Sequence, residues 1–483
     1  MAIRNDMLSV LRVEKVALTL LCIVRLSWSL SSSAITSSSQ KTVVSPNKDA
    51  LDGKKFPRTW VPLGSIYELD PDRPTPLEFL GQKYVTYRDN SEKWIVMDDA
   101  CPHRLAPLSE GRIDRDAGVV QCSYHGWEFD SSGSCTRIPQ MTEDSQQAAV
   151  ANLKSCVAAY PACVEKNILW VWPWKEDPLS VAGNKMAHPE GFLGGVGDDP
   201  STYTRDTPYG WDTLVENLID PSHVPFAHHG MQGKRTDAIP INMTMLTPIS
   251  EDGYKFHHED RTMGMLRGGT GEFRAPFVVS YDAEFKTEPK RPFGLTVCCI
   301  PTKPGWSRAI IIQGGTKEER EGEKPKKKSL PTKVFSKIPV WLTHQLSSRF
   351  LDSDAAFLHF QERERPRRSN YYMPAMADQP ITALRKWIPK YTDIEEPLPP
   401  AFPRSVIFDR WMQHTSHCKH CQAGLKTIKK WRRSTYAALV TSILGFQFRI
   451  AKVSTLLCFG ILRLLQKLEN SMKEGEFKHY ENH

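Results

Sequence analysis

The stretch that decides the fold reads Cys101-Pro-His103-Arg-Leu-Ala-Pro-Leu-Ser-Glu-Gly, followed by Cys122-Ser-Tyr-His125-Gly-Trp-Glu-Phe-Asp. Two short loops each offer one thiolate and one imidazole, and each loop carries its own turn residues. A Cys₂His₂ set can hold zinc, but a zinc finger pairs Cys-x₂-Cys with His-x₃-His, whereas here each half mixes the two ligand types. The spacing therefore indicates a [2Fe–2S] cluster, with Cys101 and Cys122 on one iron and His103 and His125 on the other. Two neutral imidazoles in place of thiolates raise the potential of such a cluster, which suits an electron relay.

The region around these loops predicts two domains of different class. From 56 to 175, short strand-like runs are separated by Asp-Asn, Ser-Gly and Pro breaks, which predicts a small all-β domain. A Gly-rich linker at 182–200 follows. The region 200–425 mixes helix candidates at 213–219 and 341–360 with long β-type runs. This ordering predicts an α+β domain rather than a doubly wound sheet.

A second metal motif lies in the α+β region and reads Glu216-Asn-Leu-Ile-Asp220-Pro-Ser-His223-Val-Pro-Phe-Ala-His228-His229. Non-haem Fe(II) oxygenases hold iron on one face by two imidazoles and a carboxylate, which leaves positions for O₂ and substrate. His-x₄-His is common and weak by itself, but together with the upstream cluster loops it predicts His223 and His228 as iron ligands. We expect His229 to be a pocket or surface residue.

The carboxylate ligand comes from far along the chain. The best candidates lie in Phe350-Leu-Asp352-Ser-Asp354, where a helical pattern points one acid inward. Asp354 shares a helical face with Phe357 and Gln361, so it is preferred over Asp352. The alternative reading of either residue is an acid near a helix N-terminus that interacts only with the macrodipole.

Composition and charge are those of a globular protein with two or three domains, with 483 residues, 40% hydrophobic residues and a formal net charge of +8. Much of the positive excess lies in 317–337 and 426–433. The first run has no interleaved aromatic pattern, so it predicts a solvated loop, and we expect no nucleic-acid partner. Residues 1–50 combine a basic flank, an apolar stretch and a Ser-rich exit. They predict a targeting leader of the bipartite type that reaches a plastid through the secretory route, with a single-pass anchor as the alternative.

The C-terminal region carries Cys418-Lys-His-Cys421 and then two apolar segments. The cysteine pair predicts a redox-regulatory dithiol and thioredoxin target, although His414, His417 and His420 also permit half of a metal site, and a structural role stays open. The apolar segments are each too short to cross a bilayer. We expect a membrane-associated helical tail at 434–468, with helices packed on the protein itself as the alternative.

The motifs CPHRLAPLSEGRID, YHGWEFD, DPSHVPFAHHG and the late HTSHCKHC resemble the chloroplast branch of the Rieske non-haem iron oxygenases. That branch includes pheophorbide a oxygenase, Tic55 and the protochlorophyllide-dependent translocon component. The resemblance implies a Rieske domain followed by a helix-grip catalytic domain with an apolar helical tail. It also implies a homotrimer in which Asp220 bridges the cluster of one subunit to the iron of its neighbour.

The activity that this resemblance implies is oxygen insertion into a chlorophyll-derived tetrapyrrole, most simply macrocycle opening as in pheophorbide a oxygenase. Electrons would come from ferredoxin or a partner reductase, and O₂ would be the co-substrate. The alternatives are hydroxylation of another chlorophyll catabolite or precursor, and a redox-sensing role in plastid protein import like that of Tic55. The expected location is a plastid, at the thylakoid or inner envelope membrane.

Overall fold

The structure is a computed structural model that describes residues 51–479 except 52, 176–177, 179–188, 198, 288–290, 314–337, 366–370, 394–396 and 446–448. The expected leader at 1–50 and the basic run at 317–337 lie outside the described residues. Two compact units divide the chain. The larger takes in the described parts of 25–326 and 361–400, and the smaller takes in those of 327–360 and 401–483.

The first part of the larger unit is built from three small antiparallel sheets and the short helix α3 (Glu143–Val150). Their strand orders are β1-β11-β10, β2-β3-β4-β9 and β5-β6-β7-β8. The strands are β1 (Val61–Ser65), β2 (Thr75–Phe79), β3 (Gln82–Arg88), β4 (Trp94–Asp98), β5 (Arg112–Asp114), β6 (Val119–Gln121), β7 (Glu128–Phe129), β8 (Cys135–Arg137), β9 (Ala159–Tyr160), β10 (Ala162–Glu165) and β11 (Ile168–Val171). Turn residues separate these short runs, as the sequence pattern predicts.

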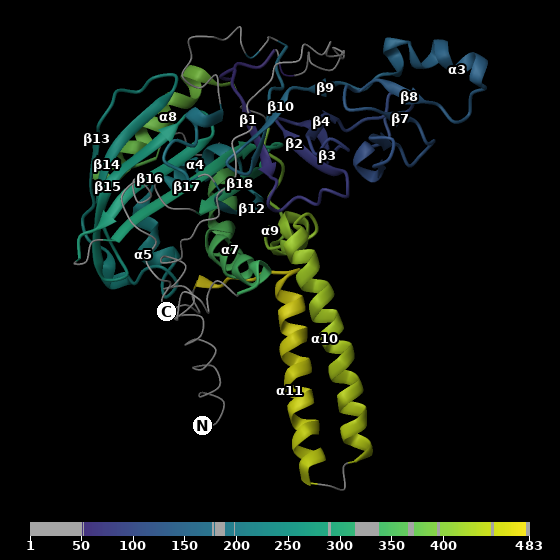
Figure 1. Ribbon diagram of the computed structural model, residues 1–483. Coiled ribbons are helices and arrows are strands. Elements are labelled where there is room, and N and C mark those ends of the chain that lie inside the picture. Colours follow the sequence, from purple (N-terminus) through teal and green to yellow (C-terminus); the bar gives the residue numbers. More distant parts are fainter. Residues whose placement is uncertain are drawn as a thin grey trace, which may run out of the picture. The chain divides into compact units, whose positions relative to one another are not determined.

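A seven-stranded antiparallel sheet forms the second part of the larger unit, in the order β12-β18-β17-β16-β15-β14-β13 (Figure 1). Its strands are β12 (Ser201–Thr207), β13 (Asn242–Met245), β14 (Gly253–Thr262), β15 (Met265–Arg274), β16 (Val278–Phe285), β17 (Arg291–Pro301) and β18 (Ser307–Gln313). Alternate residues of β14 are buried, which is the period-two pattern of a sheet with one covered face. Helices α4 (Trp211–Leu218) and α8 (Gln379–Tyr391) pack against the covered face of this sheet. Trp387 of α8 contacts Trp211 of α4 and Phe273 of β15.

Two of the small sheets, β1-β11-β10 and β2-β3-β4-β9, share one hydrophobic core with the large sheet. Phe56 lies in its centre and contacts Phe79, Trp174, Trp211 and Phe277 at ring-centroid distances between 5.7 and 6.4 Å. Aromatic pairs at such distances add to the free energy gained from burying their area. The cluster loops lie in a second hydrophobic cluster, which the remaining small sheet, β5-β6-β7-β8, shares with β3 and β4.

The smaller unit is helical in its described residues. It contains α7 (Val340–Glu364, whose residues from Gln361 on are counted with the larger unit), α9 (Arg404–Ile407), a π-helical turn at Trp411–Thr415, α10 (Lys419–Leu444) and α11 (Arg449–Ser471). Helices α10 and α11 run side by side (Figure 1). Among the described residues, no helix combines the length and the apolar character that crossing a membrane requires.

Candidate metal centres

The two cluster loops have the same backbone design. In each loop the cysteine amide donates to the carbonyl five residues later, at 2.8 Å for Cys101 and 2.9 Å for Cys122. The cysteine carbonyl in turn accepts the amide four residues later, from Leu105 and Gly126. Both of these residues have positive φ, 59° and 76°. Gly126 adopts that conformation freely, whereas Leu105 does so at a cost of about 1 kcal/mol, offset by the hydrogen bonds of the loop.

The four predicted cluster ligands divide by burial. Cys101 and Cys122 belong to one hydrophobic cluster and are 2% and 1% exposed. His103 and His125 are partly exposed, and their ring centroids lie 4.4 Å apart. Burial raises the pKa of the Cys101 thiol to about 12, and nearby Cys122 adds to the effect. Since metal ligation requires thiolates, a bound cation would supply the charge that makes this thiolate pair stable, and the donor set fits a [2Fe–2S] cluster.

Trp127 supports the exposed side of this site. Its ring stacks on His103 with a centroid distance of 4.9 Å and an interplanar angle of 4°. Stacking of this kind fixes the orientation of the imidazole, as outer contacts commonly do for metal ligands.

The iron motif lies directly after α4, in a short 3-10 helix at Pro221–His223 followed by α5 (Val224–Ala227). Asp220 caps the 3-10 helix by accepting the Ser222 amide at 2.8 Å. The turn brings His223 and His228 together, with their Nε2 atoms 3.2 Å apart. Two imidazoles bound side by side to one divalent metal at about 2.1 Å have their nitrogens about 3 Å apart, so the pair fits one ion.

Asp220 also faces the imidazole of His223, with 3.7 Å between its Oδ2 and Nδ1. Burial alone would raise the pKa of Asp220, but the neighbouring His223 imidazole and the hydrogen bond from Ser222 outweigh it and lower that pKa. A carboxylate behind a ligating histidine fixes the ring and its tautomer. His229 has another task, because its Nδ1 accepts the backbone amide of Arg235 at 3.1 Å and closes the following loop.

The two candidate carboxylates lie on α7 in the smaller unit and are both buried, Asp352 at 0% and Asp354 at 2% exposure. Within that unit Arg410 donates to Asp352 from Nε at 2.9 Å and from Nη2 at 2.5 Å. Both contacts go to Oδ2, so Asp352 is held in a buried ion pair with Arg410.

Comparison with known proteins identifies the family. The model of the Rieske [2Fe-2S] domain matches residues 59–161, and that of pheophorbide a oxygenase matches residues 273–371. Flavonoid 8-hydroxylase 2 of Ocimum basilicum is 33% identical over 76% of this chain and 73% of that protein. Pheophorbide a oxygenase of Oryza sativa subsp. japonica is 33% identical over 82% of this chain and 78% of that protein.

The chain belongs to the Rieske non-haem iron oxygenases. Its cofactors are a Rieske [2Fe–2S] cluster and a mononuclear iron, as the sequence predicted. The fold agrees, because the solved structure of dicamba monooxygenase bound to dicamba covers 68% of this chain and 96% of its own, with a TM-score of 0.50 at 16% identity. Both relatives are named as chloroplastic, which supports a plastid location for this oxygenase.

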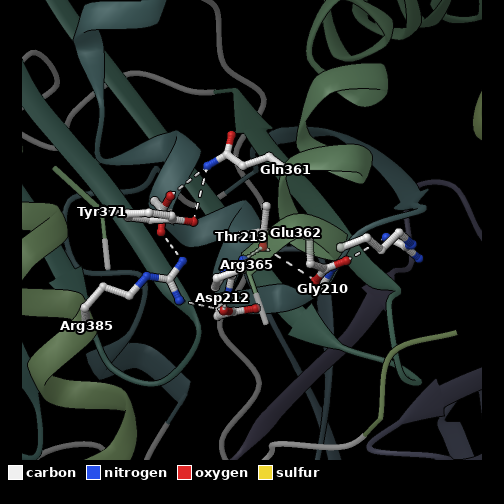
Figure 2. A network of polar contacts seen from close by, with 10 residues as sticks. Gly210, Asp212, Thr213, Gln361, Glu362, Arg365, Tyr371 and Arg385 are labelled. Atoms are coloured by element: carbon white, nitrogen blue, oxygen red, sulfur yellow. Dashed lines mark hydrogen bonds and ion pairs between the residues drawn. The ribbon is translucent and has the colours of Figure 1, made fainter. Parts of the chain in front are cut away.

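A charged network that no sequence motif predicts holds α4, the helix before the iron motif (Figure 2). Arg385 of α8 donates to Asp212, at 2.8 Å, and to Glu216, both on α4. Arg365 donates to Asp212 and to the Thr213 hydroxyl. Burial would raise the pKa of Asp212, but Arg365 and Arg385 outweigh it and lower that pKa to about 2. The only trace in the sequence is two acids four residues apart on the α4 pattern.

The end of α7 joins the same network within the larger unit. Glu362 accepts the Gly210 amide at 2.6 Å, and Gln361 donates to Glu216 at 3.1 Å and contacts the Tyr371 hydroxyl at 3.5 Å (Figure 2). Both ends of α4 are thereby tied down. This restraint holds the helix from which His223 and His228 follow.

The predicted redox pair lies in the smaller unit, where Cys418 and Cys421 are buried free thiols. They lie beside His414, which is close to them in the sequence, and beside His344 of α7, which precedes Cys418 by 74 residues. His417 and His420 are outside this group.

Proposed function

We propose that this oxygenase inserts oxygen into a chlorophyll-derived tetrapyrrole and opens its macrocycle. The observation that carries the proposal is the similarity to proteins named pheophorbide a oxygenase, which extends over 82% of this chain in the rice protein. The matching family model at 273–371 takes in strands β16, β17 and β18 of the large sheet, and α7. The similarity to the rice protein and the match to the family model therefore support the same substrate class.

A second class of substrate is favoured by one specific comparison. Flavonoid 8-hydroxylase 2 is also 33% identical, over a similar share of the chain. Hydroxylation of a smaller aromatic ring, or of another chlorophyll catabolite or precursor, is therefore the competing activity. The similarity to the protein TIC 55 of Pisum sativum, at 28% identity, supports the third option, a redox-sensing component of plastid import.

We assign the Rieske cluster to Cys101 and Cys122 on one iron and to His103 and His125 on the other. The partly exposed histidines then face outward, where an electron enters or leaves, while the buried thiolates hold the cluster in the hydrophobic core. When bound, the cluster supplies single electrons and the mononuclear iron activates O₂.

We assign the mononuclear iron to His223, His228 and Asp354, two imidazoles and one carboxylate. Asp354 is favoured over Asp352 because Arg410 occupies the latter. Asp354 also lies seven residues, or two helical turns, before Gln361, so the two share a face of α7. Gln361 is the residue that reaches α4, directly before the motif that carries the histidines.

Asp220 is proposed as the bridge between cluster and iron in a homotrimer. Its carboxylate lies against His223, so it can accept a proton from that ring while a second contact runs to the cluster histidine of a neighbouring subunit. Ferredoxin or a partner reductase would supply the electrons. The seven-stranded sheet with α4 and α8 would correspond to the helix-grip domain of the family.

Membrane association is proposed for the α10–α11 pair, within the expected tail at 434–468. Large apolar side chains are exposed along its distal part, among them Leu444 at 79%, Ile450 at 84% and Leu456 at 74%. Apolar side chains exposed in this way suit insertion at the headgroup boundary, with the neighbouring lysines and arginines reaching the lipid phosphates. A tetrapyrrole is poorly soluble in water, so this location would bring the site to its substrate.

The substrate test uses the full, iron-loaded protein incubated without oxygen with pheophorbide a, chlorophyllide, protochlorophyllide or a flavone. Reduced ferredoxin and isotopically heavy O₂ are then added, and products are analysed by mass. We expect label in an opened tetrapyrrole. Label only in the flavone would establish the second class, and no product with co-purification of import proteins would favour the redox component.

The site test compares His223→Ala with His229→Ala. Loss of the mononuclear iron and of turnover is expected for the first variant only, with the visible spectrum of the cluster unchanged in both. Asp220→Asn should keep both metal sites filled but stop reoxidation of the reduced cluster by O₂ and substrate. A variant that loses only thermal stability would instead make Asp220 a structural helix cap.

A further inference from the structure

Four buried side chains converge in the smaller unit from three separate segments. His344 comes from α7, His414 from the π-helical turn, and Cys418 and Cys421 from the start of α10. They are 3%, 3%, 1% and 0% exposed. The iron motif and the cluster loops include none of them.

The distances between their donor atoms match a tetrahedral metal site. His344 Nδ1 and His414 Nε2 lie 3.1 Å apart, and the nitrogen–sulfur distances are 3.3 Å for His414–Cys421, 3.5 Å for His344–Cys418 and 3.6 Å for His344–Cys421. Zinc bonds of about 2.1 Å to nitrogen and about 2.3 Å to sulfur, at tetrahedral angles, place two nitrogens about 3.4 Å apart and a nitrogen and a sulfur about 3.5 Å apart. All donor atoms of the group lie within 4.8 Å of one another.

We propose that His344, His414, Cys418 and Cys421 form a closed Cys₂His₂ zinc site, separate from the two iron centres. Two thiolates and two imidazoles are the donor set that zinc prefers in structural sites. Each of the four residues supplies one atom, and their burial leaves no open coordination position for a substrate. The site therefore has a structural role.

The alternative for the cysteine pair is a dithiol that thioredoxin oxidises and reduces. Thiol exchange requires a sulfur that the partner can reach, and both sulfurs belong to nearly fully buried residues. A redox pair also gives no reason for two histidines to aim single ring nitrogens at the sulfurs. The metal site accounts for all four residues together.

The local backbone is shaped to bring these segments together. The π-helical turn at Trp411–Thr415 adds a residue to the helical path before Cys418, and such turns often occur at functional sites. Gln422 donates to the carbonyl of Thr415 at 2.7 Å and fastens the turn to α10. At Gly424, α10 approaches α7 so closely that a Cβ at this position would lie 2.5 Å from the ring of Trp341 on α7. Trp341 lies one turn before His344.

The proposed zinc ties α7 to the base of the α10–α11 pair, where Leu425, Ile428, Leu465 and Met472 form the adjoining hydrophobic cluster. The same helix carries Asp352, which binds Arg410. A metal at one point of α7 and an ion pair two to three turns later restrain both its rotation and its translation. Zinc would then set the position of the helix on which the candidate iron ligand Asp354 lies.

The decisive experiment measures metals in the purified full chain by mass spectrometry of the elements. We expect about one zinc per chain in addition to the iron. His344→Ala and Cys421→Ser should each lose that zinc and keep the visible spectrum of the Rieske cluster. Cys458→Ser, a buried cysteine of α11 outside the group, and His417→Ala are matched controls that should keep it.

His344 separates the proposal from the redox alternative, because a dithiol switch does not need it. A wild-type chain without zinc, or a His344→Ala variant that retains all of it, overturns the proposal. So does a reversible Cys418–Cys421 disulfide in the wild type as isolated. If His344→Ala does not fold, His344→Cys keeps a donor atom and should keep zinc, and cobalt in the wild type should give the absorption of a tetrahedral thiolate complex. None of these readouts depends on the substrate or on turnover.

Discussion

Two sets of two cysteines and two histidines lie in the part of the chain that the structure describes, and they differ in how they are assembled and how deeply they are buried. The set at residues 101–125 comes from two neighbouring loops with one cysteine and one histidine each, and its histidines are partly exposed. The set at residues 344–421 comes from three helical segments and is buried throughout. Exposed imidazoles suit a cluster that exchanges electrons, whereas full burial suits a metal that only holds helices together.

The largest effect should follow from removing a thiolate of the first set. Cys122→Ser takes one of the two thiolates from the proposed cluster, so we expect complete loss of the visible and paramagnetic signals of the cluster and of turnover. Zinc in the second set should remain. Cys163→Ser, a partly buried cysteine outside both sets, is the control. Simultaneous loss of both metals would mean that the two sets do not fold independently.

Zinc removal from the second set should act on stability rather than on electron transfer. A site that is saturated a thousandfold above its Kd contributes about 4 kcal/mol to the stability of the unit that contains it. We expect a chelator to speed hydrogen exchange at the start of α10 and around His344, with the cluster spectrum unchanged. Unaltered exchange after proven zinc loss would remove the structural role.

Ion pairs alone, without a metal, hold α4 at Asp212. Their loss should lower the stability of the fold by a smaller, pH-dependent amount. The folded pKa of about 2 lies below the value of about 3.9 in unfolded chains, so this carboxylate stabilises the fold above pH 4 and loses that contribution as the pH falls toward 2. Asp212→Asn should cost about 2 kcal/mol at neutral pH in denaturant unfolding.

The pH dependence provides the check on that prediction. The stability difference between wild type and Asp212→Asn should close between pH 4 and 2, because Asp212 becomes protonated in the wild type as well. Asp72→Asn, in the exposed pair with Arg115, should change stability by less than about 1 kcal/mol. A difference that stays constant with pH would place the effect in packing rather than in charge.

The smallest effect concerns the exposed edge of the first set. Trp127→Phe shrinks the ring that stacks on His103 and lets water approach that imidazole. We expect the cluster to form normally but its reduction potential to shift by roughly tens of millivolts, measured by redox titration. Trp431→Phe, a half-exposed tryptophan of α10, should leave the potential unchanged.

Much of this molecule could be predicted because the deciding features are local. The cluster loops are short turns whose hydrogen bonds repeat at the same offsets, so the ligand spacing itself carries the geometry. The iron motif is equally compact, and the turn after α4 brings His223 and His228 together. The strand-rich first part and the mixed second part also follow from their residue patterns, and the similarity to known oxygenases confirms the family.

The C-terminal helices were harder to predict. The two apolar segments of the expected tail at 434–468 predict two short helices, but α10 begins at Lys419 and runs through the basic stretch at 426–433. Leu425 and Ile428, spaced by three residues, are buried there and hold the helix against its neighbours. A short apolar stripe within a charged segment is too weak a signal to place a helix boundary.

By itself the sequence determined the oxygenase chemistry, because a metal bound within one or two turns leaves its ligands at fixed spacings. Only the tertiary structure decided which acid of α7 is engaged by Arg410, how Arg385 restrains α4, and that His344 meets the late cysteine pair. The two residues of each contact lie many positions apart, and no fixed number of residues has to separate them. Packing of helices brings them together, so no pattern along the sequence records the contact.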